Sequence, residues 1–378
     1  MKIIERSRCV ISGNAYLEPL YTFPDFPVFM GCVDEPEELD LKKDMSWWIS
    51  RGSGLIQLKE LLPLDVLYPE SHGAGAVGSL WERHHKAFAN FVSTMRPSSI
   101  LEIGGAHGIL EREYQQFDEI PWTILEPNPS PVDGTKARFI KGFFDKNFTY
   151  LDNFDTLLHS HVFEHIYNPD DFMRHLSTFM SEGKKLAFSL PNMEIMLERK
   201  YTNCINFEHT VFLTEPYVEF LLTKHGFKIL EKKYFMDDHS IFYSAIRDDN
   251  VECTFLPKGL YEKNKKLYMD YATYHKQLIA SLNKKINKTN QPIYLFGAHV
   301  FAQYLIKMGL NTEKIAYILD NDLKKEGRRL YGTKLIVKSP KVLAYKKSPI
   351  VILKAGVYNN EIKRDILENI NKSTIFFE

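Results

Sequence analysis

The chain has 378 residues, of which 44% are hydrophobic and 25% charged, and its 48 basic and 48 acidic residues give a formal net charge of zero. This balance argues against a protein that binds nucleic-acid backbones, and no apolar run reaches the about 18–20 residues that a bilayer span needs. We therefore expect neither a nucleic-acid nor a membrane partner. The N-terminus lacks the apolar core of a signal peptide and the four cysteines show no paired spacing, so we expect reduced thiols and a cytoplasmic location.

Residues 1–80 are predicted to form a small, irregular N-terminal domain. Prolines recur along it, and its short apolar stretches, such as 55–58, show no sustained periodicity. Residues 81–95 then place aromatic and histidine side chains at three- and four-residue steps. This spacing predicts an amphipathic helix that ends before Pro97.

From residue 99 onward, short apolar segments alternate with helical patterns, as in an α/β protein with a parallel sheet. The strands expected in the central domain, residues 81–257, are 100–103, 122–125, 154–158, 186–190, 227–230 and 240–246. A polar stretch rich in lysine and tyrosine then predicts one long helix over 258–290. The strands expected after it are 293–296, 315–319, 350–353 and 374–377, with a helix over 300–309. Residues 258–378 therefore predict a second, Rossmann-like α/β domain.

The strongest chemical signal is a glycine-rich turn after the first expected strand of the central domain, Glu102-Ile103-Gly104-Gly105-Ala106-His107-Gly108. Glycines let a ligand approach the backbone closely, and the next helix offers free N–H groups. Dinucleotide enzymes use a similar turn, but the acidic residue inside the strand resembles the first motif of methyltransferases. Glu126, at the end of the next strand, can accept hydrogen bonds from both ribose hydroxyls of a nucleoside. We therefore predict an S-adenosylmethionine site with contacts from Glu102, Gly104, Gly105, His107, Gly108 and Glu126.

Two later segments extend this predicted cofactor site. Phe144 and Asp145 lie where the fold usually contacts adenine, although phenylalanines there can equally be core residues. His159, His161 and His165 follow the strand expected over 154–158, at the edge where cofactor and substrate meet. Nothing in the sequence fixes these three histidines on one face, so we predict no metal and assign His161 to the cofactor site.

The order of motifs from residue 99 to the end resembles that of a known family. The matching segments include Val162-Phe163-Glu164-His165, Asn206-Phe207-Glu208-His209, Asp238-His239-Ser240, Gly297-Ala298-His299 and, most specific, Tyr317-Ile318-Leu319-Asp320-Asn321-Asp322. They resemble the nucleotide-sugar C-methyltransferases of deoxysugar biosynthesis. That family has an N-terminal zinc-binding domain, a class I methyl-donor domain and a C-terminal Rossmann-like domain. The resemblance implies the same order here, over 1–80, 81–257 and 258–378, with S-adenosylmethionine as cofactor.

The N-terminal region departs from the family in its zinc ligands. The family binds zinc through two C-x-x-C pairs, whereas the corresponding positions here are Cys9, Ser12, Ser50 and Ser53. Serine hydroxyls are poor zinc ligands at neutral pH, so we expect no zinc in this domain.

A second departure concerns the expected chemistry. The family's Y-x-E-H segment reads Asn206-Phe207-Glu208-His209 here, and the loop in which the family tends to place another tyrosine reads Ser71-His72-Gly73-Ala74-Gly75. C-methylation needs an enolate, and losing tyrosine hydroxyls weakens oxyanion support. We therefore predict O-methylation of a sugar hydroxyl, with His209 as the base, steered by Glu208. His72 and His239 are weaker candidates for the base, and a buried structural pair of Glu208 and His209 is the alternative.

Several alternatives stay open at the level of sequence. They are C-methylation at C3 of a 4-keto nucleotide deoxysugar, an NAD-dependent sugar-nucleotide enzyme, and a non-catalytic binding protein. The second glycine turn, Gly297-Ala298-His299 with Asp320 beyond it, either binds a nucleotide or only frames the substrate. We expect a nucleotide-sugar substrate from carbohydrate biosynthesis and a monomer or homodimer.

Overall fold

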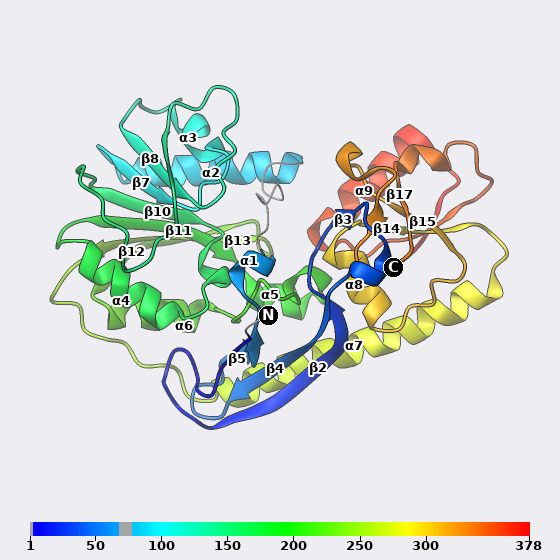
Figure 1. Ribbon diagram of the computed structural model, residues 1–378, viewed down its shortest axis with the longest axis horizontal. Coiled ribbons are helices and arrows are strands. Elements are labelled where there is room, and N and C mark those ends of the chain that lie inside the picture. The colour runs from blue at the N-terminus through cyan, green and yellow to red at the C-terminus, as the bar shows by residue number, and fades with distance from the viewer. Residues whose placement is uncertain (1–2, 68–77) are drawn as a thin grey trace.

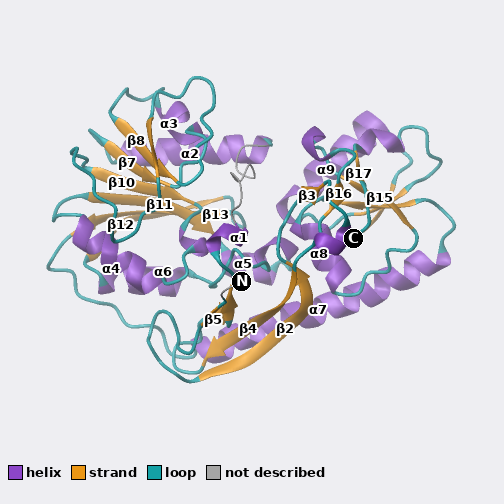
Figure 2. Cartoon of the chain, in the orientation of Figure 1, coloured by secondary structure: helices purple, strands orange, loops and turns teal. Residues whose placement is uncertain are grey.

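The computed structural model describes residues 3–67 and 78–378. Two α/β units lie side by side, and a curved N-terminal sheet and a long helix run along beneath them (Figure 1). Helices flank the strands of both units (Figure 2). No helix in the described part of the chain is both long and apolar enough to cross a bilayer.

The central unit is built on a seven-stranded sheet in the order β12-β13-β11-β10-β7-β8-β9. Its strands are β7 (Ile100–Ile103), β8 (Trp122–Glu126), β9 (Arg138–Lys141), β10 (Thr156–Ser160), β11 (Lys185–Pro191), β12 (Phe227–Phe235) and β13 (Ser240–Arg247). β13 runs antiparallel to both of its neighbours, while the other neighbouring pairs are parallel. This arrangement confirms the predicted class I methyltransferase fold.

Two layers of helices bury the two faces of this sheet, which is why its inner strands read as continuous apolar runs. The helices are α2 (Ser79–Thr94), α3 (Ile109–Tyr114), α4 (Pro169–Phe179) and α6 (Glu215–Lys224), whereas α5 (Met193–Glu198) packs with the N-terminal region. Along β7, Ile100 packs in one core with α2 and α3, while the next residue, Leu101, packs in another with α4 and α6. The carboxyl ends of the parallel strands therefore stay free to carry a site.

The C-terminal unit is a second parallel sheet, in the order β17-β15-β14-β18-β19. Its elements are β14 (Ile293–Phe296), α8 (Val300–Lys307), β15 (Ile315–Leu319), β17 (Val337–Lys338), β18 (Ile350–Ile352), α9 (Asn359–Asp365) and β19 (Ile375–Phe377). The predicted second Rossmann-like unit is therefore confirmed, as is the long helix before it, α7 (Leu260–Lys288). Tyrosines and aliphatic residues of α7 join the core that links the N-terminal and C-terminal sheets.

The N-terminal region holds more regular structure than its sequence pattern predicted. It contains the antiparallel sheet β2-β4-β5, with β2 (Leu17–Pro27), β4 (Lys42–Ser50) and β5 (Ile56–Leu58). Shorter elements accompany it: β1 (Ile4–Glu5) with β6 (Glu60–Leu61), β3 (Cys32–Val33) with β16 (Arg329–Leu330), and α1 (Leu64–Leu67). The prolines of β2 are tolerated because β2 is an edge strand whose register shifts against β4.

The four positions that correspond to the family's zinc ligands lie close together. The Cys9 thiol lies 3.2 Å from the Ser53 hydroxyl, and the Ser12 amide donates to Cys9 at 3.5 Å. The Ser53 amide donates to the Ser50 hydroxyl at 3.3 Å, and the hydroxyl of Tyr217, in α6, donates to the Ser53 carbonyl at 2.8 Å. The four groups thus contact one another within the N-terminal region, and the Tyr217 hydroxyl ties that region to the central unit.

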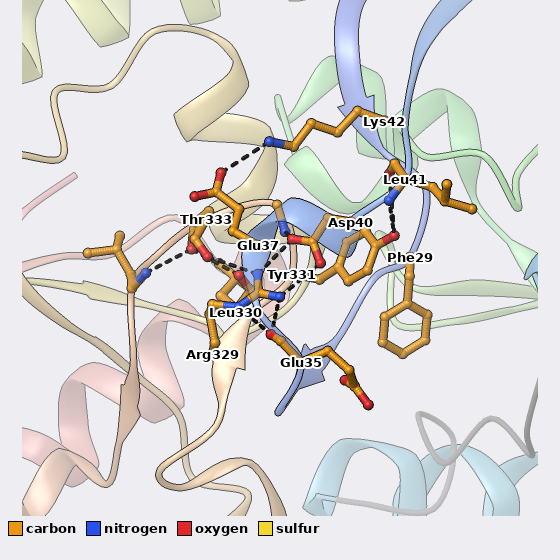
Figure 3. A network of polar contacts seen from close by, with 12 residues as sticks. Phe29, Glu35, Glu37, Asp40, Leu41, Lys42, Arg329, Leu330, Tyr331 and Thr333 are labelled. Carbon is orange, nitrogen blue, oxygen red and sulfur yellow. Dashed lines mark hydrogen bonds and ion pairs between the residues drawn. The ribbon is translucent and has the colours of Figure 1, made fainter.

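A network around Arg329 fastens the N-terminal region to the C-terminal unit (Figure 3). Its guanidinium donates to both carboxylate oxygens of Asp40, at 2.6 and 2.9 Å, and to the Glu35 carbonyl. The Asp40 carboxylate also accepts from the Gly332 amide at 2.6 Å. The Arg329 and Asp40 side chains are only 10% and 2% exposed, so solvent screens this bidentate ion pair little.

Candidate functional site

The predicted glycine turn lies between β7 and α3 and has the shape that a nucleoside ligand requires. Gly104 and Gly108 adopt left-handed φ angles of 74° and 72°. A Cβ on Gly105 would lie 2.6 Å from the carboxyl carbon of Glu102 and 2.8 Å from a methyl of Ile124. Only glycine therefore lets the turn fold down onto the strands and keep its upper side open.

Glu102 lies beneath this turn, and it is 2% exposed. Its carboxyl group accepts a hydrogen bond from the Trp122 indole at 2.8 Å. Burial raises the pKa of Glu102 to about 8, so the group is mostly protonated at neutral pH. Its role in the unliganded fold is to support Gly105 and orient Trp122.

The buried carboxyl group gives a testable pH dependence. Because its folded-state pKa is raised far above the usual value near 4.3 for glutamate, its contribution to stability is present below about pH 4.5 and is lost as the pH rises towards 8. We expect Glu102→Gln to gain about 2–4 kcal/mol relative to the unmodified protein between pH 5 and pH 8. Urea unfolding at each pH measures this, with Glu119→Gln, an exposed glutamate, as control. If the free energies of unfolding of Glu102→Gln and of the unmodified protein changed with pH in parallel, the raised pKa of Glu102 would be refuted.

Glu126 lies at the end of β8, beside the turn. Its carboxylate accepts from the Ala106 amide at 3.1 Å and from the Asn128 amide at 3.0 Å. The His107 ring nitrogen Nδ1 lies 2.7 Å from the Ser130 carbonyl, so it donates there, and no hydrogen-bond partner of Nε2 lies among the described residues. The turn, Glu126 and His107 therefore lie together, as the prediction of a nucleoside site requires.

Phe144 and Asp145 follow β9. The Phe144 ring packs against His175 and Phe179, with centroids 4.6 and 5.1 Å away, which matches the alternative that it is a core residue. The Asp145 carboxylate accepts from the Asn147 amide at 2.8 Å and is exposed. Their contact with adenine stays a prediction.

The loop after β10 and the start of β13 bring together two histidines that the sequence assigned to different roles. His161 has a left-handed φ of 53°, and its Nε2 lies 2.9 Å from the Ser240 hydroxyl. Nδ1 of His239 lies 2.6 Å from the same hydroxyl. His159, in contrast, is fully buried and stacks on Phe188 with centroids 5.0 Å apart.

A second polar group lies at the same edge of the sheet and contains Glu164, His165, Glu208 and His209. Nε2 of His165 lies 3.9 Å from the Glu164 carboxylate, and Nδ1 of His165 lies 3.9 Å from the Glu208 carboxylate. The ring centroids of His165 and His209 are 5.2 Å apart. The sequence analysis did not propose Glu164 or His165 for catalysis. Their position directly after a parallel strand is the sequence signal from which they could have been predicted.

Asn206 shapes the turn that carries Glu208 and His209. Its side-chain oxygen accepts from the amides of both residues, each at 2.8 Å, and its nitrogen donates to the Asn203 carbonyl at 3.0 Å. The side chain is therefore engaged with the backbone on both ends. Asn206 acts as a positioning residue in this geometry.

Burial sets the protonation of this polar group. It lowers the pKa of His209 to about 4, with His161 acting in the same direction, and it raises the pKa of Glu164 to about 7. The His209 imidazole is thus neutral at pH 7 and can accept a proton. His72, the remaining candidate base, lies outside the described residues.

The second glycine turn repeats the geometry of the first. Gly297 has a φ of 103°, and the Asp320 carboxylate at the end of β15 accepts from the Ala298 amide at 2.8 Å, as Glu126 does from Ala106. The charge of His299, next in the turn, contributes to the lowered pKa of His209. His299 therefore lies near enough to His209 to affect its titration.

Comparisons with known proteins agree with this architecture. A family model described as a methyltransferase domain matches residues 80–232, and another, described as a C-methyltransferase C-terminal domain, matches residues 261–377. No curated protein matches the chain. Magnesium protoporphyrin IX methyltransferase from Synechocystis PCC 6803, solved with bound SAH, is 12% identical with a TM-score of 0.36, and the match covers 46% of this chain and 89% of that one. The N-methyltransferase NodS from Bradyrhizobium japonicum WM9 is 14% identical with a TM-score of 0.35, and the match covers 44% of this chain and 97% of that one. The chain is thus similar to methyltransferase domains over residues 80–232 and to C-methyltransferase C-terminal domains over residues 261–377.

Proposed function

We propose that this protein transfers a methyl group from S-adenosylmethionine to a hydroxyl of a nucleotide-activated sugar. The cofactor, when bound, supplies a methyl group on a sulfonium leaving group. Glu126, His107 and the Gly104–Gly108 turn hold its nucleoside, and His161 lies at its reactive end. The residue ranges 1–80, 81–257 and 258–378 act as cap, methyl-donor domain and substrate-nucleotide domain.

The acceptor chemistry follows from the residues around His209. Its neutral imidazole removes the hydroxyl proton as the oxygen attacks the methyl group, while alignment of the two reactants supplies much of the rate. An oxygen of Glu164 lies within 4.8 Å of a ring nitrogen of His209, and the carboxylates of Glu164 and Glu208 each lie 3.9 Å from the neighbouring His165, so acidic groups surround the base.

The observation that favours O-methylation is the state of Asn206. Its oxygen accepts from two backbone amides, one of its two N–H groups donates to the Asn203 carbonyl, and the residue is only 2% exposed, so its side chain serves the turn and does not replace a tyrosine hydroxyl at an enolate oxygen. C-methylation at the carbon beside a 4-keto group remains the second candidate, because the match over 261–377 is to a C-methyltransferase domain.

Mass spectrometry of nucleotide sugars incubated with S-adenosylmethionine tests the proposal. We expect a product 14 mass units heavier, with the methyl group on oxygen, and no exchange of carbon-bound hydrogen when the substrate is incubated in heavy water. Exchange beside a ketone would establish the C-methylation alternative. A chain that binds NADH in preference to S-adenosylmethionine in calorimetry would contradict both.

A further inference from the structure

Three histidines from separate parts of the chain meet in the central unit. They are His84 in α2, His161 after β10 and His239 before β13, and one ring nitrogen from each lies within 4.8 Å of the other two. His84 and His239 are 0% and 4% exposed. The cluster shares no residue with Cys9 and its serine neighbours or with the group around His209, although Glu164 of that group contacts His161.

His84 is the unusual member of the cluster. Neither of its ring nitrogens has a hydrogen-bond partner among the described residues, although the side chain is completely buried. The rings of Phe235 and Phe242 pack against it, with centroids 5.2 and 5.3 Å away. Burying a polar group without a partner costs about 1–3 kcal/mol, so an apolar residue would be the expected occupant of this position. A ligand that uses a nitrogen of His84 accounts for its presence.

Polar neighbours orient the other two imidazoles, and the Ser240 hydroxyl, 2.9 Å from Nε2 of His161, has to turn away for that nitrogen to bind a metal. On the far side of the His161 ring from Ser240, Nδ1 lies 3.1 Å from the buried carboxyl group of Glu164. A carboxylate behind a histidine is the common arrangement that orients a ligating ring. Nδ1 of His239 is held by the Ser240 hydroxyl, which leaves Nε2 for a ligand.

We propose that His84, His161 and His239 form a binding site for one divalent transition-metal ion of the zinc and cobalt type. Three imidazoles with a fourth position open are typical of zinc sites that act on substrates, whereas Mg²⁺ and Ca²⁺ prefer oxygen ligands. Tetrahedral bonds of about 2.0–2.1 Å require nitrogens roughly 3.4 Å apart, so the rings move together by about 1 Å on binding. The inference does not depend on which acceptor is methylated, although His161 is shared with the proposed cofactor site.

Cobalt binding to the full chain tests the proposal without an activity assay. After treatment with a chelator, we expect the protein to bind about one Co²⁺ per chain and to show the visible absorption bands of a low-symmetry site, and Zn²⁺ should abolish those bands. His84→Leu and His239→Gln should each lose at least tenfold in affinity. His225→Gln, a histidine paired with Asp170 elsewhere, should bind as the unmodified protein does.

Thermal unfolding separates a lost ligand from a lost fold. His84→Leu removes two unpartnered nitrogens, so we expect it to be at least as stable as the metal-free protein. Added Zn²⁺ should raise the melting temperature of the unmodified protein and of His225→Gln, but not of His84→Leu. Equal cobalt binding and equal zinc stabilisation in the unmodified protein and His84→Leu would overturn the proposal, as would no metal binding by either.

Discussion

Replacing Glu126 by alanine should weaken binding of S-adenosylmethionine by about a hundredfold while leaving the chain folded. The carboxylate holds the amides of Ala106 and Asn128 and thereby fixes the glycine turn next to the place where a ribose would lie. Hydrogen bonds to a charged group contribute about 1.5–3 kcal/mol each, and 1.4 kcal/mol corresponds to about a factor of ten in affinity. Losing two ribose contacts therefore accounts for about two powers of ten.

Calorimetric titration with S-adenosylmethionine and with its demethylated product measures this effect. Glu119→Ala is the matched control, because Glu119 belongs to the same unit but is exposed and pairs with Lys136. Its affinity should equal that of the unmodified protein. A Glu126→Ala variant that binds the cofactor normally would mean that the nucleoside lies elsewhere.

The sequence predicted the inner strands of the two α/β sheets well because most of them are apolar and buried on both faces, as β7 and β14 are. Ile100–Ile103, Ile293–Phe296 and Ile315–Leu319 were predicted to the residue, since each is a short apolar run bounded by turns. The N-terminal sheet was missed because β2 lies at an edge, contains prolines and alternates irregularly between buried and exposed positions. Its pattern therefore lacks both periods on which a prediction depends.

The site could be predicted only where its residues are neighbours in the chain. The glycine turn and Glu126 are linked by consecutive strands, so their proximity follows from the topology. The meeting of His84, His161 and His239 depends on how α2 packs against β13 and is invisible in the sequence. Glu208 was expected to steer His209, and its carboxylate also lies 3.9 Å from His165. The domain limits and the sugar substrate stay predictions.

Replacing His209 by alanine should reduce turnover by about a hundredfold to ten-thousandfold, the usual contribution of a general base, with little change in cofactor affinity. His225→Ala is the control, because His225 is bound by Asp170 outside the proposed site. Retained turnover in His209→Ala would exclude His209 as the base. His165, whose ring centroid lies 5.2 Å from that of His209, would then be the next candidate.

The pH dependence of the unmodified enzyme separates this site from an ordinary histidine. A base must be neutral to act, and the pKa of His209 is lowered to about 4 because the ring is buried. We expect kcat/KM to stay level from pH 8 to about 5.5 and to fall only as the pH approaches 4, whereas an unperturbed imidazole would lose activity below about pH 6.5. Burial also lowers the pKa of His159, His161 and His239. Below about pH 6.5 the unfolded chain therefore binds more protons at these histidines than the folded chain does, so their contribution to the free energy of unfolding decreases as the pH is lowered. Circular dichroism at each pH must therefore accompany the kinetics, and a fall in kcat/KM centred near 6.5 in fully folded enzyme would show that another group is the base.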